Sequence, residues 1–186
     1  NKVVLGFFLY TIVLGYGMTI VENLIFLYFK ELNASNFLCG LSVVVTVVFE
    51  IPLFSRSKQL LERYGEHALL TMAGLCYSFR VVGYTLCPGG WYVLLFEPLH
   101  GVTVALCGTA SVQMMTSITP AALVATGQAF MNLLRSCFGS SLGTFVGGAI
   151  IRNYGEAACY RSSAVLVASG LLLYRAALPR HREETS

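Results

Sequence analysis

Several ionisable side chains lie inside long apolar stretches of this 186-residue sequence. They are Glu22, Glu50, Arg80, Glu97, His100 and Arg135. A charged side chain at the centre of a bilayer costs at least about 2.5–3.5 kcal/mol, so such groups are usually functional. Three acids and two arginines give the cluster a net charge of −1 when the histidine is neutral and zero when it is protonated. Because imidazole titrates near neutral pH, the cluster is suited to taking up or releasing a proton.

Glu97 and His100 are predicted to carry a coupled proton. They stand three positions apart, and side chains at that spacing share one helix face. Pro98 follows Glu97 and would free a backbone carbonyl one turn earlier, and Pro52 would do the same near Glu50, which is therefore assigned to the same role. Each proline could instead make only a structural kink. The alternative is structural: these groups could lock helices together, for example through an ion pair between Glu97 and Arg80.

A polar stripe along the predicted fifth helix indicates contacts to a solute. It consists of Gln128, Asn132, Arg135 and Gly139. Steps of four, three and four residues place these positions within roughly 60° of one another on an α-helix. Arg135 could hold a carboxylate or phosphate with its planar fork, or pair with an acid on another helix. The predicted substrate-binding set consists of Arg135, the two amides Gln128 and Asn132, and Glu22 and Arg80.

Two further patterns concern packing. Gly139, Gly143 and Gly147 form a GxxxGxxxG run, and small residues at this spacing let helices approach closely. The run predicts packing inside a helix bundle, with a dimer interface as the alternative. Tyr77, Arg80 and Tyr84 form a similar stripe on the predicted third helix. Tyrosines near the ends of spans are often only anchors at the membrane surface, and this interpretation ranks Tyr77 and Tyr84 below the other candidates.

The composition is typical of an all-α membrane protein with several spans. Hydrophobic residues make up 56% of the chain and charged residues 11%, the mean hydropathy is +0.70, and aspartate is absent. This excludes a soluble domain, whose surface needs far more charge, and the net charge of +3 does not indicate a nucleic-acid partner. We expect no cofactor and no metal, because the Cys and His spacings match no ligand set. Without a nucleophile–base arrangement, no enzyme is expected.

About 20 apolar residues are needed to cross a bilayer as a helix. By this criterion we predict one six-helix transmembrane domain over 1–178 and a polar cytoplasmic tail over 179–186. The predicted spans are about 3–29, 37–55, 68–87, 91–118, 121–151 and 157–178. Placing both ends in the cytoplasm puts most Lys and Arg residues on that side, as the positive-inside rule requires. We expect a multi-pass protein of the plasma membrane.

The sequence also contains a short internal repeat. The tripeptide Tyr-Gly-Glu occurs at 64–66 and again at 154–156, after the second and the fifth predicted spans, with an arginine before each copy. An offset of three spans would place the two copies on opposite faces of the membrane. This pattern predicts a 3+3 inverted repeat, as found in secondary transporters.

The first copy lies in a segment that resembles a motif of the major facilitator superfamily. LLERYGEHALL (60–70) is similar to the loop between the second and third helices of each six-helix half, written G-x-L-a-D-R-x-G-R-R. Glu62, Arg63 and Gly65 match the acid, the arginine and the second glycine of that motif, which the resemblance implies to be a gating loop. Lys58 replaces the first glycine, and the basic pair is replaced by Glu-His.

A longer segment, residues 125–166, resembles the eleventh helix and the following loop of the lactose-permease-like branch of this superfamily. Within that branch it looks most like the major facilitator domain-containing protein 6 group. The disposition of charges along the helices is also similar to that of lactose permease. The resemblance implies that the chain is the C-terminal six-helix half of a major facilitator bundle.

From these observations we expect a secondary active transporter that moves a small polar solute by proton symport. A second possibility is a receptor or scaffold of the same fold that transports nothing. The chain starts at an asparagine, so we expect it to be part of a longer polypeptide. Its expected partners are the solute, the lipid bilayer and an N-terminal six-helix half of the same polypeptide.

Overall fold

The computed structural model describes residues 2–178 of the chain, and this range is built from helices and the turns between them. The helices are α1 (Lys2–Glu31), α2 (Asn36–Ser55), α3 (Ser57–Tyr84), α4 (Gly90–Val93), α5 (Glu97–Ile118), η1 (Ala121–Leu123), α6 (Val124–Asn132), η2 (Leu133–Gly139), α7 (Ser140–Tyr154) and α8 (Glu156–Ala177). The short η1 is a 3₁₀ turn and η2 is a π-helix. The tail predicted at 179–186 lies outside the described residues.

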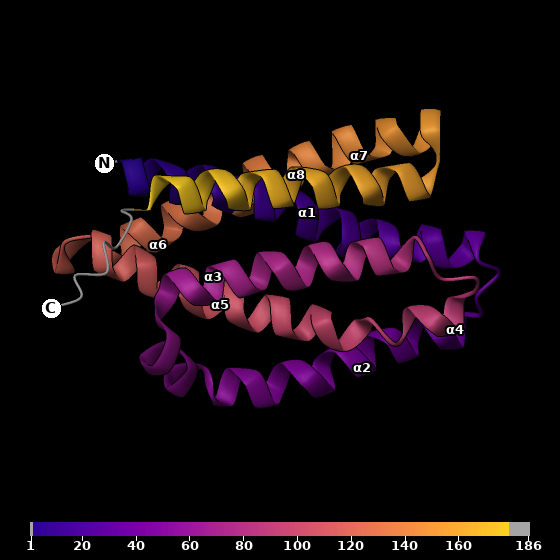
Figure 1. Ribbon diagram of the computed structural model, residues 1–186, viewed down its shortest axis with the longest axis horizontal. Helices are drawn as coiled ribbons and strands as arrows, with labels where there is room; N and C mark the ends of the chain where they lie inside the picture. Colours follow the sequence, from indigo (N-terminus) through magenta and orange to yellow (C-terminus); the bar gives the residue numbers. More distant parts are fainter. Residues whose placement is uncertain (1, 179–186) are drawn as a thin grey trace, which may run out of the picture.

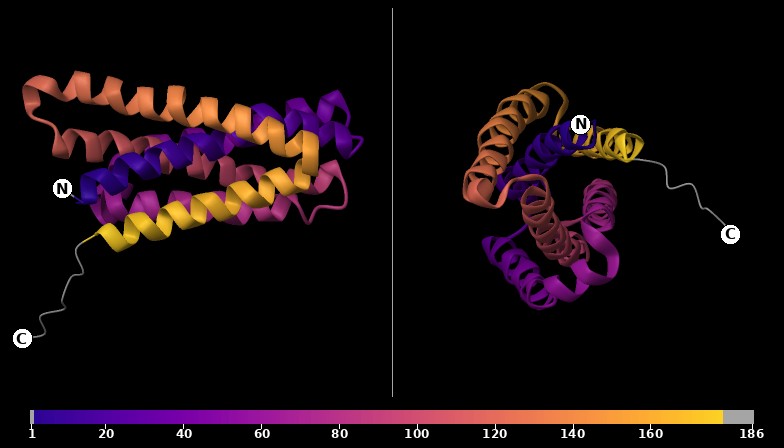
Figure 2. Two further views of the ribbon diagram at one scale, coloured as in Figure 1. Left: turned by 90° about the horizontal axis from the view of Figure 1, so that it is seen from above. Right: turned by 90° about the vertical axis from the view of Figure 1, so that its left-hand side faces the viewer.

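The long helices run lengthwise in one elongated bundle (Figures 1 and 2). The helix α1 packs against α8, η2 and α7, whereas α5 packs against α2 and α3, and contacts between α3 and α8 join these two groups. Figure 1 shows the start of α1, the α2–α3 turn and the end of α8 at one end of the bundle. The α1–α2 and α7–α8 turns lie at the opposite end.

Four helices of the described chain are long and apolar enough to cross a membrane. They are Lys2–Glu31, Asn36–Ser55, the stretch Gly90–Ile118 and Glu156–Ala177. The two other predicted spans, 68–87 and 121–151, are also largely helical, in α3 and in the run from η1 to α7. An all-helical membrane protein is therefore confirmed, while six membrane crossings remain a prediction.

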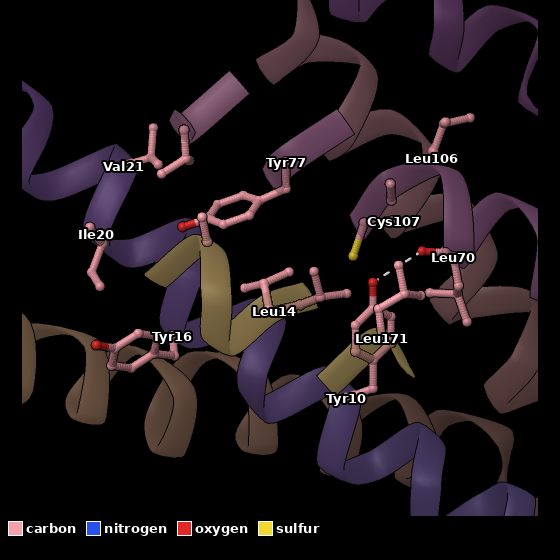
Figure 3. Close-up of a cluster of buried hydrophobic side chains, with 14 of the residues drawn as sticks. Tyr10, Leu14, Tyr16, Ile20, Val21, Leu70, Tyr77, Leu106, Cys107 and Leu171 are labelled. Atoms are coloured by element: carbon pink, nitrogen blue, oxygen red, sulfur yellow. Dashed lines mark hydrogen bonds between the residues drawn. The ribbon is translucent and has the colours of Figure 1, made fainter. Parts of the chain in front are cut away.

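Tyrosines form much of the core, which Figure 3 shows around α1. Tyr77 and Tyr84 are both fully buried, so the interpretation of these residues as anchors at the membrane surface was wrong. The hydroxyl of Tyr77 donates to the carbonyl of Gly17 at 2.8 Å, and that of Tyr10 donates to the carbonyl of Leu70 at 3.2 Å. Because these hydroxyls have partners on neighbouring helices, tyrosine is tolerated in the interior.

The glycine run packs inside the bundle, as predicted. A Cβ on Gly139 would lie 2.8 Å from the carbonyl oxygen of Ile12, and one on Gly143 would lie 2.7 Å from that of Tyr16. Both acceptors belong to α1, whose own Gly15 contacts the backbone of η2 equally closely. Small residues on both sides therefore bring α1 and the η2–α7 segment into backbone contact.

The charged segment after α2 is helical, although the sequence predicted a break there. Helix α3 begins at Ser57, and its backbone leaves helical geometry only at Gly65, where φ is 74° and ψ is 164°. Leu, Glu, Arg, Lys and Gln, which dominate the segment, are good helix formers, so their charge does not end the helix. Within α3, the departure from helical geometry is confined to Gly65, because glycine tolerates positive φ.

The predicted span over 91–118 coincides with a candidate membrane span, but a turn interrupts its helix. Helix α4 ends at Val93, a turn follows, and α5 begins at Glu97. Pro98 lies in the first turn of α5, where its missing N–H would have had no helical partner. This proline therefore starts a helix and does not free a carbonyl within one, whereas Pro52 does lie inside α2.

The central glycines of the two Tyr-Gly-Glu tripeptides adopt nearly the same backbone conformation. Gly65 has φ 74° and ψ 164°, and Gly155 has φ 84° and ψ 172°. These are the only glycines with positive φ among residues 2–178, and they lie at opposite ends of the bundle (Figure 1). The repeat in the sequence is thus accompanied by a repeated backbone conformation at its glycine.

Candidate functional site

A cavity of about 230 Å³ lies among α1, α2 and α5 and is lined by Glu97 and His100, the predicted proton-carrying pair. Its lining consists of Val21, Glu22, Ile25, Phe26, Ser42, Val43, Thr46, Glu97 and His100. Because Glu97 and His100 occupy one turn of α5, both face this space, as their spacing predicted. We call it the acidic cavity, since two carboxylate residues and no Lys or Arg line it.

Glu97 is firmly positioned. It is 3% exposed, and its carboxylate accepts hydrogen bonds from the hydroxyl of Tyr84 at 2.8 Å and from that of Thr46 at 2.9 Å. It is also the first residue of α5, where the positive end of the helix dipole favours a negative charge. Three helices therefore fix this carboxylate: α5 carries it, and α2 and α3 donate to it.

Arg80 is fully buried beside this group, but it does not pair with it. No hydrogen-bond partner for its guanidinium nitrogens is found among the described residues, and no ion pair with Glu97 is formed. The guanidinium instead lies 5.6 Å from the ring centres of both Tyr77 and Tyr84, a cation–π arrangement. Tyr84 thus contacts both charges, Glu97 through its hydroxyl and Arg80 through its ring. Arg80 lines neither cavity described here.

A second cavity of about 160 Å³ lies between α1, α5 and the η2–α7 segment. Its lining consists of Gly15, Met18, Thr19, Glu22, Val104, Cys107, Arg135, Ser136 and Ser140. We call it the arginine cavity. Glu22 lines this cavity and the acidic cavity, so the two adjoin at its side chain. Nearby, the hydroxyl of Thr19 donates to that of Ser140 at 2.6 Å.

Charges in the arginine cavity are unpaired. Neither Glu22 nor Arg135 forms an ion pair within 4.0 Å, and Lys58–Glu62 is the one ion pair found in residues 2–178. Arg135 lies within hydrogen-bonding reach of the thiol of Cys107, but no ion pair joins it to Glu22. Opposite charges that face one cavity without meeting leave their hydrogen-bonding capacity open to water or to a solute.

The predicted polar stripe is only partly brought together, because Arg135 lies within a π-helix. The wider turns of η2 end the 100° spacing on which the prediction rested. Gln128 donates to the carbonyl of Val112 at 2.9 Å, Asn132 is exposed, and neither lines the two cavities described here. Arg135 is the residue of this stripe that lines one of them. A π-helix leaves no signal in polar periodicity, so the sequence could not reveal it.

The remaining predicted residues line neither cavity. Glu50 is half-buried on α2 and lines neither of them. In the predicted gating loop, Glu62 is exposed and pairs with Lys58 at 3.9 Å, one helical turn away. The guanidinium of Arg63 lies 5.3 Å from the ring centre of Tyr64.

Sequence reasoning missed the two donors to Glu97. Thr46 is one of few polar residues in the apolar α2, and this isolation was the signal that could have singled it out. Tyr84 ends α3, where a tyrosine is also the usual residue at a membrane surface, so its type and position gave no such signal.

Comparison with known proteins places these features in a family. Residues 1–162 match the MFS_1 like family. The chain is 25% identical over 174 residues to mouse (Mus musculus) major facilitator superfamily domain-containing protein 6-like, covering 92% of the chain and 29% of that protein. The human (Homo sapiens) protein of the same name is 26% identical over 179 residues, covering 93% and 30%.

A bacterial relative is also found. The maltose permease of Geobacillus stearothermophilus is 24% identical over 168 residues, covering 90% of the chain and 43% of the permease. The chain therefore spans less than half the length of each of these three relatives.

Proposed function

The chain belongs to the MFS_1 like family and so to the major facilitator superfamily, and on that premise we propose that it is part of a proton-coupled secondary transporter for a small polar solute. The observation that carries the proposal is the junction of the two cavities at Glu22. One cavity holds the positioned Glu97 with His100, and the other holds the unpaired Arg135. A proton site and a solute site thus adjoin through one carboxylate.

The solute is proposed to bind in the arginine cavity. Arg135 presents a planar set of donors, Glu22 presents acceptors, and the hydroxyls of Ser136 and Ser140 can serve as either. Such a set suits a solute with several hydroxyl or other polar groups. The bacterial relative named maltose permease makes maltose the first solute to test.

The coupled proton is proposed to reside on Glu97, with His100 facing the same cavity. As an anion, Glu97 is stabilised by two hydroxyl donors and the start of α5. Arg80, one tyrosine ring away, provides a cation that favours release of the proton. Because a bare carboxylate is costly in a dry interior, entry of solute or water would change the proton occupancy.

The membrane arrangement follows from the same premise. We propose six spans in a 3+3 inverted repeat, residues 1–178 as one half of a two-half bundle, and both ends in the cytoplasm of a plasma-membrane protein. The matched backbone of Gly65 and Gly155 supports the repeat, and the Lys/Arg distribution supports the orientation. The other half is proposed to be an N-terminal six-helix unit of the same polypeptide.

Labelling tests this orientation. In a Cys-free background, Tyr154→Cys should react with an impermeant maleimide added outside intact cells, because Tyr154 is 77% exposed at the outer end. Lys58→Cys, whose side chain is 87% exposed at the other end, should react only after permeabilisation. The reverse pattern would overturn the proposed orientation.

Transport itself is tested with the complete polypeptide in proteoliposomes. Labelled maltose, followed by a panel of other small polar solutes, should accumulate when an inward proton gradient is imposed. The alternative is a receptor or scaffold of the same fold, which would show neither uptake nor exchange of any solute in the panel. Unpaired charges that line an interior cavity favour the transporter, because a scaffold binds no solute that would satisfy them.

A further inference from the structure

A groove separate from both cavities runs between α3 and α8. It has a volume of about 310 Å³ and is lined by Ser78, Val82, Arg161, Ala164, Val165 and Ala168. In the end-on view of Figure 2, α3 and α8 lie along one outer edge of the bundle, away from α6 and α7. The groove exists because the facing side chains are small, so that the packed helices leave a channel between them.

The walls of the groove suit a hydrocarbon chain. The hydroxyl of Ser78 donates to the carbonyl of Gly74 at 2.9 Å, so this polar group is satisfied within its own helix. Phe79, which follows Ser78 on α3, is 66% exposed, and Val165 in the lining itself is 67% exposed. Because α8 is apolar enough to cross a membrane, side chains with this exposure face lipid.

One cation stands at the end of the groove. Arg161 is the only charged residue in its lining. Its Nε donates to the hydroxyl of Thr85 at 3.4 Å, which directs the guanidinium towards α3, and its terminal nitrogens have no partner among the described residues. The nearest acid along α8 is Glu156, which lies five residues earlier and so about 140° around the helix.

The position of Arg161 along α8 matches the depth of lipid headgroups. It lies six residues beyond Gly155, or about 9 Å along the helix axis, and a long arginine side chain reaches back to the polar interface. From there the apolar part of the groove extends seven residues, to Ala168, about 10 Å deeper into the bilayer. The cation and the apolar channel thus follow one another in the order of a phospholipid headgroup and its acyl chain.

We propose that this groove is a binding site for an anionic phospholipid, whose phosphate contacts the terminal nitrogens of Arg161 and whose acyl chain lies between α3 and α8. Charge complementarity selects this occupant, because the lining offers one free cation and no acid. The site does not depend on the proposed transport function. A second copy of the chain, or another part of the polypeptide, would be the competing occupant.

Native mass spectrometry of the full-length protein in nanodiscs of mixed phosphatidylglycerol and phosphatidylcholine tests the proposal. Retained phosphatidylglycerol is counted for the wild type, Arg161→Gln and Arg152→Gln. Arg152 is the matched control, because it is exposed near the same end of the bundle but lines no groove described here. We expect Arg161→Gln to weaken phosphatidylglycerol retention about fivefold, the usual effect of one basic residue near an anionic headgroup, and Arg152→Gln to change it little.

A second variant tests the channel itself. Ala168→Leu fills the groove but leaves Arg161 in place, so it should also reduce phosphatidylglycerol retention. Equal retention in Arg161→Gln and Arg152→Gln would overturn the headgroup contact, and unchanged retention in Ala168→Leu would overturn the acyl-chain channel. If Ala168→Leu instead converts a dimer to a monomer at constant lipid content, a second copy occupies the groove and the proposal is wrong.

Discussion

The acidic cavity and the arginine cavity share Glu22, but the charged side chains that line them are held differently. In the acidic cavity, Glu97 is buried and receives two hydrogen bonds from neighbouring helices. In the arginine cavity, Glu22 and Arg135 face the same space and neither forms an ion pair in the described chain. The first arrangement holds one group in a fixed position, and the second leaves two groups open.

This difference indicates that the two cavities have separate roles. A carboxylate held by neutral hydroxyls can keep its place with or without its proton, because hydroxyls both donate and accept. Unpaired charges, in contrast, are costly at membrane depth unless something else satisfies them for part of the time. Within the proposed transporter, the solute and water would do so.

The largest effect is expected at Arg135. Replacing it with Gln should weaken solute binding at least tenfold, because a hydrogen bond from a charged donor to the solute contributes about 1.5–3 kcal/mol. Arg135→Lys should also bind weakly, since it keeps the charge but loses the planar fork. Both are measured as solute affinity by counterflow in proteoliposomes, with Arg152→Gln as the control. Wild-type affinity in Arg135→Lys would show that only the charge matters there.

An intermediate effect is expected at Tyr84. Its hydroxyl donates to a carboxylate, so Tyr84→Phe should lower the free energy of unfolding by about 1.5–3 kcal/mol, the range for hydrogen bonds to charged groups. Tyr28 is a matched control, because it is also buried but donates to a neutral backbone carbonyl, at 2.8 Å. Tyr28→Phe should cost about 1 kcal/mol. Equal losses in the detergent-solubilised variants would mean that Glu97 is not held as an anion.

Glu97, His100 and Arg135 were identified from residue type and spacing alone. Intramembrane charge is a strong signal, and an i, i+3 pair shares a face in any α-helix. The packing of the glycine run inside the bundle was also predicted from the sequence, because close helix contact needs small residues. The same reasoning located all the helices approximately, because apolar length is what a membrane selects.

The rest depended on tertiary contacts that no local pattern encodes. The π-helix at 133–139 changes the angle between Gln128 and Asn132 before it and Arg135 within it from the one that α-helical periodicity predicted. Tyr84 became the bridge between Glu97 and Arg80 because α3 and α5 pack together there. Its residue type is compatible with a lipid interface as well as with a buried bridge.

The smallest effect is expected at the two matched turns, which compare the halves of the repeat. Gly65→Ala and Gly155→Ala should each cost about 1 kcal/mol, at the lower end for a backbone position that only glycine adopts readily. Gly148→Ala is the control, since it is helical and a Cβ there meets nothing within 4 Å. Alanine at that site should be neutral or stabilising. A large difference between the two turn variants in thermal unfolding would argue against equivalent roles.

The central claim, that Glu97 carries the coupled proton beside a separate solute site, is tested most directly by Glu97→Gln in proteoliposomes. The amide keeps the shape and hydrogen-bonding capacity of the carboxyl group but releases no proton. The variant should still exchange solute across the membrane at a rate close to wild type, because exchange needs no net proton movement, and it should fail to accumulate solute against a gradient. A well-folded Glu97→Gln protein that still accumulates solute would contradict the account.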